Sequence, residues 1–288
     1  MPNVLVTGAN GQVGSELRAL SNAYEYTFFF TDRGTLDIGD INAVEAFVGD
    51  NAIDAILNCA AYTAVDKAQS EPDNADAINH LAVKNLAHIA KTKGITLVHI
   101  STDYVFDGTH HRPYIESDAT HPMGVYGQSK CDGEAAMLAI NPANSLILRT
   151  SWVYSSFGAN FVKTMVRLGK ERTSLGVVFD QVGTPTYARD LARAMLEILP
   201  QIESRDVEIY HYSNEGVTSW YDFAKEIMRM AKLSCAIHPL LSQEYPTPTK
   251  RPHYSVLDKS KIKKIFAITI PYWKDSLDEM LTILGERK

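Results

Sequence analysis

Tyr126 and Lys130 stand four residues apart in the stretch VYGQSK, directly after a proline-containing loop. On a helix, a four-residue step brings both side chains onto one face. A tyrosine hydroxyl has an ordinary pKa of about 10, and a nearby ammonium group lowers it by stabilising the phenolate. Such a tyrosine can donate a proton to the alkoxide that forms when a carbonyl is reduced. The same spacing occurs on ordinary surface helices, so the rest of the chain has to decide between the two.

A second group of polar residues comes earlier, in HISTDYVFDG (His99–Gly108). Ser101 and Thr102 fall at the carboxyl end of an expected strand, which is where open α/β sheets bind their ligands. A Thr102 hydroxyl at this edge would hold the carbonyl oxygen in place. Because Tyr126 and Lys130 open the next expected helix at the same edge, the three residues together predict a hydride-transfer site.

A glycine-rich turn, TGANGQVG, lies between the first expected strand and the first expected helix. Gly8, Gly11 and Gly14 allow a tight turn, close approach of the backbone to a pyrophosphate, and close packing of helix on strand. The helix start also presents free N–H groups to the phosphates. A plain tight turn is the alternative, but the strand–turn–helix context favours a dinucleotide site.

The end of the second expected strand bears on which dinucleotide is bound. Asp32 can hold both ribose hydroxyls of NADH, whereas Arg33 can pair with the 2′-phosphate of NADPH. A solvated charged turn is the alternative. Asp37 begins a short Asp-Ile segment that could border the adenine. The cofactor is therefore expected to be NADPH or NADH. In the loop NCAAYTAVDKA, Ala60 and Ala61 allow either close approach of a cofactor or tight packing, and composition does not separate these.

These motifs need elements to position them, and the first half of the chain alternates short apolar strands with longer helical patterns. This alternation predicts an α/β fold with a doubly wound, Rossmann-like parallel sheet. We expect a dinucleotide-binding domain over 1–153 and a smaller, interleaved substrate lobe over 154–288, with a returning strand near 209–213. The expected strands are 4–7, 26–31, 55–59, 97–101 and 146–152, and the expected helices are 11–20, 40–48, 74–93, 126–140, 157–169, 187–199 and 219–231; the proline-rich 245–252 is expected to be a loop.

Composition excludes several classes of protein. The 288 residues carry a net charge of −6 without a basic stripe, which disfavours a nucleic-acid binder. No apolar run approaches a membrane span, and the start MPNVLV lacks the features of a signal peptide. The three scattered cysteines have neither disulfide nor metal spacing, so we expect a cytoplasmic protein. The doublet His110-His111 lacks further ligands nearby, and no metal is expected. Cys59 is interpreted as a core residue, Asp66, Lys67 and Glu71 as a charged approach to a helix, and Trp220-Tyr221 as helix packing.

Taken together, these residues resemble the extended short-chain dehydrogenase/reductase family and, more narrowly, the dTDP-4-dehydrorhamnose reductase family within it. The glycine motif and Tyr-x-x-x-Lys are shared by the wider family. The narrower resemblance covers nearly the whole chain and rests on more specific stretches: AAYTAVDKAQSEP (60–72), STDYVFDG (101–108), RTSWVY (149–154), NFVKTM (160–165), DQVGTPT (180–186) and YPTPTKRPHYS (245–255).

The resemblance implies reduction of the C4 ketone of dTDP-4-dehydro-L-rhamnose to dTDP-L-rhamnose. It implies that Tyr126 is the proton donor, that Lys130 tunes it and contacts the ribose, and that Thr102 orients the carbonyl. Arg251 makes chemical sense as a diphosphate clamp, because its planar fork matches phosphate oxygens. The implied cofactor contacts are Gly11, Gln12, Val13, Asp32, Asp37, Ile38, Ala61, Tyr62 and Thr63, and the implied sugar-nucleotide contacts are Thr102, Asp103, Trp152, Asn160 and Arg251.

Two rival functions remain open on the sequence. A sugar-nucleotide dehydratase or epimerase has the same fold, but the related dehydratases carry an Asp-Glu pair after the strand-end threonine, whereas Asp103-Tyr104 stands here. A cofactor-binding regulatory subunit without turnover is the second rival. The presence of Thr102, Tyr126 and Lys130 weighs against it.

One departure from the family concerns assembly. Some of these reductases dimerise around magnesium held by carboxylates from the first helix and from a loop after DQxGxPT. Glu16 retains the first position, but Arg189 stands beside Asp190 in that loop. A guanidinium opposes a cation that demands oxygen ligands. We therefore expect a monomer or a metal-independent dimer, with Glu16 and Arg189 paired or in solvent.

Overall fold

A computed structural model describes residues 1–287 and contains a six-stranded sheet in the order β10-β5-β4-β3-β1-β2. Every adjacent pair in this sheet is parallel. The central strands are buried on both faces, as their near-continuous apolar sequences require. The doubly wound fold is thus confirmed. The strands are β1 (Asn3–Thr7), β2 (Thr27–Phe30), β3 (Ala55–Asn58), β4 (Thr96–Thr102), β5 (Leu146–Thr150) and β10 (Glu208–His211).

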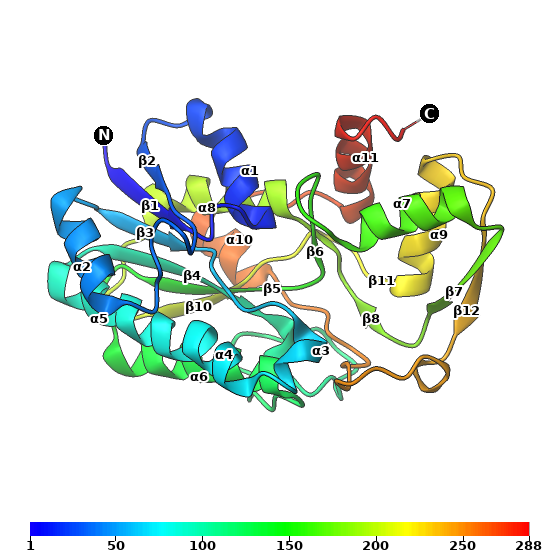
Figure 1. Cartoon of the computed structure of the whole chain (residues 1–288), viewed down its shortest axis with the longest axis horizontal. Coiled ribbons are helices and arrows are strands. Elements are labelled where there is room, and N and C mark those ends of the chain that lie inside the picture. Colours follow the sequence, from blue (N-terminus) through cyan, green and yellow to red (C-terminus); the bar gives the residue numbers. More distant parts are fainter. Residues whose placement is uncertain (288) are drawn as a thin grey trace.

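Helices cover both faces of this sheet (Figure 1). One face packs on α1 (Gln12–Leu20), α8 (Ala188–Ile198) and α10 (Ser260–Phe266). The other packs on α2 (Ile41–Asp50), α5 (Ala82–Lys93) and α6 (Val125–Ile140). Within residues 1–287, no helix is long and apolar enough to cross a membrane.

The helix expected over 74–93 is present, but it is not a uniform α-helix. Helical backbone continues from α4 (Pro72–Asp76) through a π-helical turn η2 (Ala77–Leu81) into α5. At Gly133 of α6, an added Cβ would lie 2.1 Å from the carbonyl oxygen of Asn79. The wider turn lets these two backbones touch, and π-turns of this kind are frequent at functional sites.

Two other boundaries differ from expectation for local reasons. Strand β5 ends at Thr150 rather than Trp152, because Trp152 has a left-handed φ of 48°. Helix α7 (Phe161–Glu171) begins four residues later than expected. Gly158 precedes it at φ 64°, and Asn160 caps it by accepting a hydrogen bond from the Lys163 N–H.

The second half forms a lobe with its own core, built mainly on α7, α9 (Trp220–Met230) and α11 (Trp273–Ile283) (Figure 1, right). Strand β10 leaves this half to join the large sheet beside β5. The division at residue 153 stays a prediction, and 245–252 contains no helix or strand. The remaining elements are α3 (Val65–Ala68), β6 (Val153–Tyr154), β7 (Ser174–Val178), β8 (Val182–Gly183), β9 (Thr186–Tyr187), β11 (Thr218–Ser219), β12 (Ala236–Leu240), η1 (Ser21–Ala23), η3 (Asp103–Val105), η4 (Leu199–Gln201) and η5 (Ser242–Glu244).

Candidate active site

Thr102 ends β4, and Tyr126 lies in the first turn of α6. The helix start can approach η3 because position 127 is glycine, where an added Cβ would lie 2.3 Å from the Tyr104 carbonyl oxygen. The rings of Tyr104 and Tyr126 meet edge to face, 5.5 Å apart. Burial raises the pKa of Tyr126 to about 12, a hydrogen bond with Thr102 lowers it, and nearby Asp103 raises it. Tyr126 is therefore a protonated phenol at neutral pH.

Lys130 lies one turn further along α6 and is 1% exposed. Its Nζ donates to the Ile100 carbonyl oxygen over 2.6 Å and lies 3.3 Å from Nε2 of His99. Burial lowers the pKa of Lys130 to about 8, although Glu134 raises it. The sequence suggested that Lys130 lowers the pKa of Tyr126. In this structure the ammonium contacts β4 instead, and Thr102 supplies the interaction that lowers the tyrosine pKa.

The glycine turn between β1 and α1 forms a close-packed cradle. Gly8 has φ 64°, and an added Cβ there would lie 2.6 Å from the amide nitrogen of Ala60. A Cβ at Gly14 would lie 2.5 Å from the Gly8 carbonyl oxygen. Helix α1 starts after Gly11 without a side-chain cap, so its first N–H groups remain available. These features fit a pyrophosphate bound at the helix start, flanked by Gln12 and Val13.

Asp32 follows β2 at the same edge of the sheet. Its carboxylate accepts hydrogen bonds from the N–H groups of Thr35 and Gly34 and from the Asn10 amide, and those from Thr35 are the main reason its pKa is lowered. Arg33 is 84% exposed and only loosely paired with Asp37, at 3.7 Å. A carboxylate for ribose hydroxyls and an exposed guanidinium for a 2′-phosphate are thus both present. Ile38 is buried next to them.

The loop after β3 holds Ala61, Tyr62 and Thr63. The side-chain amide of Asn79, on the π-helical turn, accepts a hydrogen bond from the Tyr62 N–H over 2.9 Å and donates one to the Tyr62 carbonyl over 3.0 Å. The Tyr62 hydroxyl donates to Glu71 over 2.6 Å, which raises the pKa of the tyrosine to about 12. Glu71, which the sequence suggested only approaches a helix, therefore helps to fix the loop expected to border the cofactor.

Trp152 and Trp220 connect the sheet to the second lobe. Their rings stack 3.6 Å apart with an interplanar angle of 11°. Gly183 makes room, since a Cβ there would lie 2.7 Å from the Trp152 ring. Trp220 thus packs against the residue expected to contact the sugar, not only against its own helix.

Arg251 and Asn160 lie in the second half of the chain, where the resemblance places sugar-nucleotide contacts. Arg251 pairs with Asp66 through Nη2 at 2.8 Å, while its buried Nη1 has no partner within residues 1–287. An unpartnered guanidinium nitrogen fits a diphosphate oxygen. Asn160 caps α7 and donates to the Gln12 side chain over 3.0 Å. Its contact with substrate stays a prediction.

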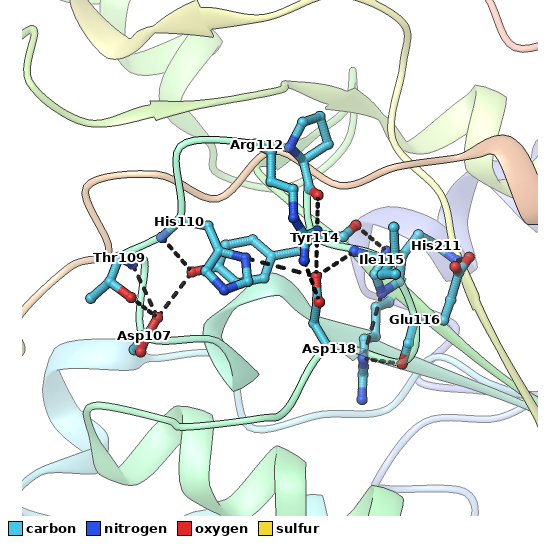
Figure 2. Close-up of polar contacts among 11 residues, drawn as sticks. Asp107, Thr109, His110, Arg112, Tyr114, Ile115, Glu116, Asp118 and His211 are labelled. Atoms are coloured by element: carbon cyan, nitrogen blue, oxygen red, sulfur yellow. Dashed lines mark hydrogen bonds and ion pairs between the residues drawn. The ribbon is translucent and has the colours of Figure 1, made fainter.

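Residues 107–118 belong to the loop between η3 and α6 and form a dense polar network (Figure 2). Asp118 accepts two hydrogen bonds from the Arg112 guanidinium and one from the Ile115 N–H. His110 stacks on Tyr114 and lies 3.8 Å from Asp118, so a carboxylate is nearby after all. Within residues 1–287, no three His, Cys, Asp or Glu side chains gather as a metal site.

Glu16 is a fully buried residue of α1, and burial raises the pKa of its carboxyl group. One carboxylate oxygen accepts from the Ser155 hydroxyl over 2.6 Å, and the other lies 3.5 Å from the Arg189 guanidinium. Arg189 also lies 3.5 Å from Glu279. A cation-bearing side chain thus stands where magnesium would need oxygen ligands, and these residues do not fit the metal.

Sequence reasoning passed over two buried polar residues, His99 and Asn79. His99 is 0% exposed and touches Lys130, and Asn79 also donates to Ser129 in the turn between Tyr126 and Lys130. The signal for His99 was present, because it is a polar residue inside the otherwise apolar run LVHI.

The family model described as "RmlD substrate binding domain" matches residues 2–285. The chain is 41% identical over 287 residues to a dTDP-4-dehydrorhamnose reductase of Sinorhizobium fredii, covering 97% of this chain and 96% of the relative. It is also 41% identical to the Escherichia coli K12 protein of that name, with 98% of each chain covered. The chain belongs to this family.

Solved structures agree with this membership. The dTDP-4-dehydrorhamnose reductase of Clostridium acetobutylicum superimposes with a TM-score of 0.93 at 41% identity, covering 98% of this chain and 99% of the other. The Bacillus anthracis reductase, solved in complex with NADP, gives 0.93 at 37% identity, with 98% and 100% covered. The family inferred from the motifs is confirmed.

Proposed function

We propose that this protein is an NAD(P)H-dependent dTDP-4-dehydrorhamnose reductase. Its substrate is the C4 ketone of dTDP-4-dehydro-L-rhamnose, and its product is dTDP-L-rhamnose. The observation that carries the proposal is that Thr102, Tyr126 and Lys130 come together where β4 ends and α6 begins, in a chain with 41% identity to named reductases. Bound NADPH or NADH supplies the hydride.

Tyr126 acts as the proton donor. Its phenol is fully protonated at neutral pH, because burial raises its pKa to about 12. An alkoxide is more basic than a phenolate, so the proton moves from Tyr126 to O4 as the carbonyl is reduced. The Thr102 hydroxyl holds O4 beforehand and stabilises the phenolate afterwards. Solvent then returns the proton to the tyrosine.

The nucleotide sugar contacts residues of both the sheet edge and the second lobe. The free Nη1 of Arg251 meets a diphosphate oxygen, and Asp66 holds the guanidinium in position from its other side. The ring of Trp152, supported by Trp220, contacts the hexose. Asp103, buried beside Thr102, completes the contacts near C4.

The rival dehydratase chemistry lacks a required group. It needs a second carboxylate directly after Asp103, and Tyr104 occupies that position, with its pKa raised by burial. A dTDP-glucose 4,6-dehydratase of Bacillus anthracis shares the fold with a TM-score of 0.83 but only 18% identity. We also propose a cytoplasmic protein, consistent with three free cysteines, and a monomer or a dimer without a bridging metal.

The decisive assay follows nicotinamide absorbance with purified protein, dTDP-4-dehydro-L-rhamnose, and NADH or NADPH in turn. Oxidation of either cofactor that depends on the sugar supports the reductase. No oxidation of either, together with retained cofactor binding, would instead favour the binding subunit without turnover. Release of water from dTDP-glucose without net cofactor oxidation would favour the dehydratase.

A further inference from the structure

Four buried polar side chains form a continuous row from the nucleotide cradle to α6. Thr7, Asn58 and His99 stand directly opposite one another on β1, β3 and β4. The Thr7 hydroxyl lies 2.7 Å from Asn58 Oδ1, and Asn58 Nδ2 lies 2.9 Å from His99 Nδ1. His99 Nε2 is 3.3 Å from Lys130 Nζ. Each of the four residues is at most 1% exposed, so the row is shielded from water.

The charge of Lys130 dictates how this row is hydrogen-bonded. An ammonium group can only donate, so a charged Lys130 requires Nε2 of His99 to be an acceptor. The imidazole is then neutral, carries its proton on Nδ1, and donates to the Asn58 amide oxygen. An amide rotated by 180° fills the same volume, and its NH₂ group then donates to Thr7.

A neutral Lys130 reverses every bond in the row. Nε2–H of His99 then donates to the free electron pair of Nζ, Nδ1 accepts from the Asn58 NH₂, and the Thr7 hydroxyl donates to the amide oxygen. Lys130 still donates to the Ile100 carbonyl in both states. Because a buried polar group without a partner is costly, a single direction along the whole row is favoured over mixtures of the two.

We propose that His99 is a positioning residue for Lys130: a neutral imidazole, oriented by Asn58 and Thr7, that holds Nζ at the carboxyl edge of β4 and couples its own tautomer to the charge of the lysine. The role of this lysine in turnover rests on the proposed function. The contact between His99 and Lys130 does not, since both side chains belong to the fold itself.

His99 is suited to this role because it cannot compete for the proton. Burial, and then the neighbouring Lys130, hold the pKa of His99 well below its ordinary value. The lysine has no ion pair within residues 1–287, so the imidazole and the Ile100 carbonyl are its hydrogen-bond partners. The titratable and charged groups around this part of α6 are His99 on β4, Tyr126 and Glu134 on α6 itself, Arg149 on β5 and Asp103 on η3.

The direct test is the ¹⁵N imidazole spectrum of the wild-type protein between pH 6 and 10, with the His99 signals assigned from His99→Gln. We expect His99 to be neutral throughout, with the proton on Nδ1 below about pH 7 and on Nε2 above about pH 9. A proton on Nε2 at pH 6, or a tautomer that does not change with pH, would overturn the proposal. Neither outcome depends on the substrate, so a failed reductase assay leaves this test intact.

A second test follows Lys130 itself by ¹³C at Cε, in His99→Leu and in the control His88→Leu, which alters an exposed histidine of α5. Loss of a hydrogen bond to a charged group should lower the pKa of Lys130 by at least about one pH unit in His99→Leu only. Turnover should fall on the order of 10-fold, mainly in kcat, with the alkaline limb of the pH profile moved to lower pH. His99→Gln should restore part of both.

An unchanged Lys130 midpoint in His99→Leu would show that the imidazole only fills space. If that variant does not fold, Asn58→Leu gives the same information, because it removes the partner that fixes the tautomer. We then expect the pH-dependent tautomer change of His99 to disappear, and its persistence would overturn the proposal.

Discussion

Lys130 and Arg149 are both buried cations at the sheet face covered by α6, and their surroundings are opposite. Arg149 makes three hydrogen bonds to the Glu134 carboxylate, of 2.6 to 3.2 Å, and each of these side chains is 3% exposed. Lys130 meets only a carbonyl oxygen and a neutral imidazole. The arginine is neutralised in place, whereas the lysine retains an unbalanced charge that burial disfavours.

The same contrast separates two carboxylates. Glu16 is buried with Arg189 and Ser155 and is closed to any ligand. Asp32 faces solvent with neutral donors as its partners. A charge with an opposite partner is occupied within the fold, whereas a charge surrounded by neutral groups remains free for a cofactor or a reaction. We call the first kind of charge balanced and the second unbalanced, and substitutions can show to which kind a residue belongs.

The largest effect is expected at the hydroxyl of Tyr126, which is hydrogen-bonded to Thr102. Tyr126→Phe removes the proton donor and keeps the ring, so turnover should fall by roughly 10²-fold or more while cofactor binding is largely kept. Steady-state kinetics and a cofactor titration measure both. Tyr104→Phe, in the neighbouring ring, is the control and should lose far less. Near-normal turnover in Tyr126→Phe would remove this residue from the mechanism.

Glu134→Gln tests the balanced side. It leaves the Arg149 charge buried without its partner, so the free energy of unfolding should fall by about 3–5 kcal/mol. Urea denaturation measures this loss. The matched control is Glu171→Gln, which breaks the exposed pair with Arg167 and should change stability by less than about 1 kcal/mol. Similar losses in the two variants would mean that the buried pair has no special role.

Lys130→Met should raise the free energy of unfolding rather than lower it, because it removes an unbalanced buried charge. Below about pH 8, the lysine is charged in both the folded and the unfolded state, and burial of that charge opposes folding. Between about pH 8 and 10.5 the unfolded chain binds more protons, so wild-type stability gains as pH rises. The variant should be about 1–3 kcal/mol more stable at pH 7, with the difference shrinking toward pH 10, although inactive. If the variant were less stable than the wild type at pH 7, the charge of Lys130 would be stabilised within the fold, as that of Arg149 is.

Asp32→Ala should weaken the binding of NADH more than that of NADPH, with the KM for NADH raised by roughly 10-fold relative to that for NADPH. The ribose hydroxyls lose their acceptor, while Arg33 can still meet a 2′-phosphate. Kinetics with each cofactor measure the ratio. Asp37→Ala, which removes the loose partner of Arg33, serves as the comparison. Equal losses for both cofactors would contradict the assignment of Asp32.

The smallest effect is expected at Glu16, which already has a cation beside it. EDTA should leave both activity and light-scattering mass unchanged, because Arg189 stands where a metal would have to lie. Loss of activity together with loss of a larger species would show that a metal bridges two copies after all, with Asp190 or another acid as a ligand.

The sequence was a good guide wherever function depends on strand ends. Glycine spacing and polar residues after each apolar strand were sufficient to predict the parallel sheet and to bring Gly8, Asp32 and Thr102 to one edge. It failed where long-range packing decides. Within the helix over 74–93 it missed the π turn at Ala77–Leu81, where Gly133 of α6 packs closely on Asn79, a contact between segments more than fifty residues apart. The direction in which Lys130 points likewise depends on His99, across the boundary between helix and sheet.

The return of β10 to the sheet has a consequence for how the chain is made. A ribosome that has released residues 1–153 has delivered the cradle, Tyr126 and Lys130, yet β5 still lacks its neighbour and Arg149 still lacks His211 beside it. The face of the sheet opposite α6 is also still uncovered, because it packs on α8 and on Ile262 and Phe266 of α10. Domains usually fold as units while synthesis proceeds, but here residues 1–153 must remain an unfinished intermediate until nearly the last residues emerge.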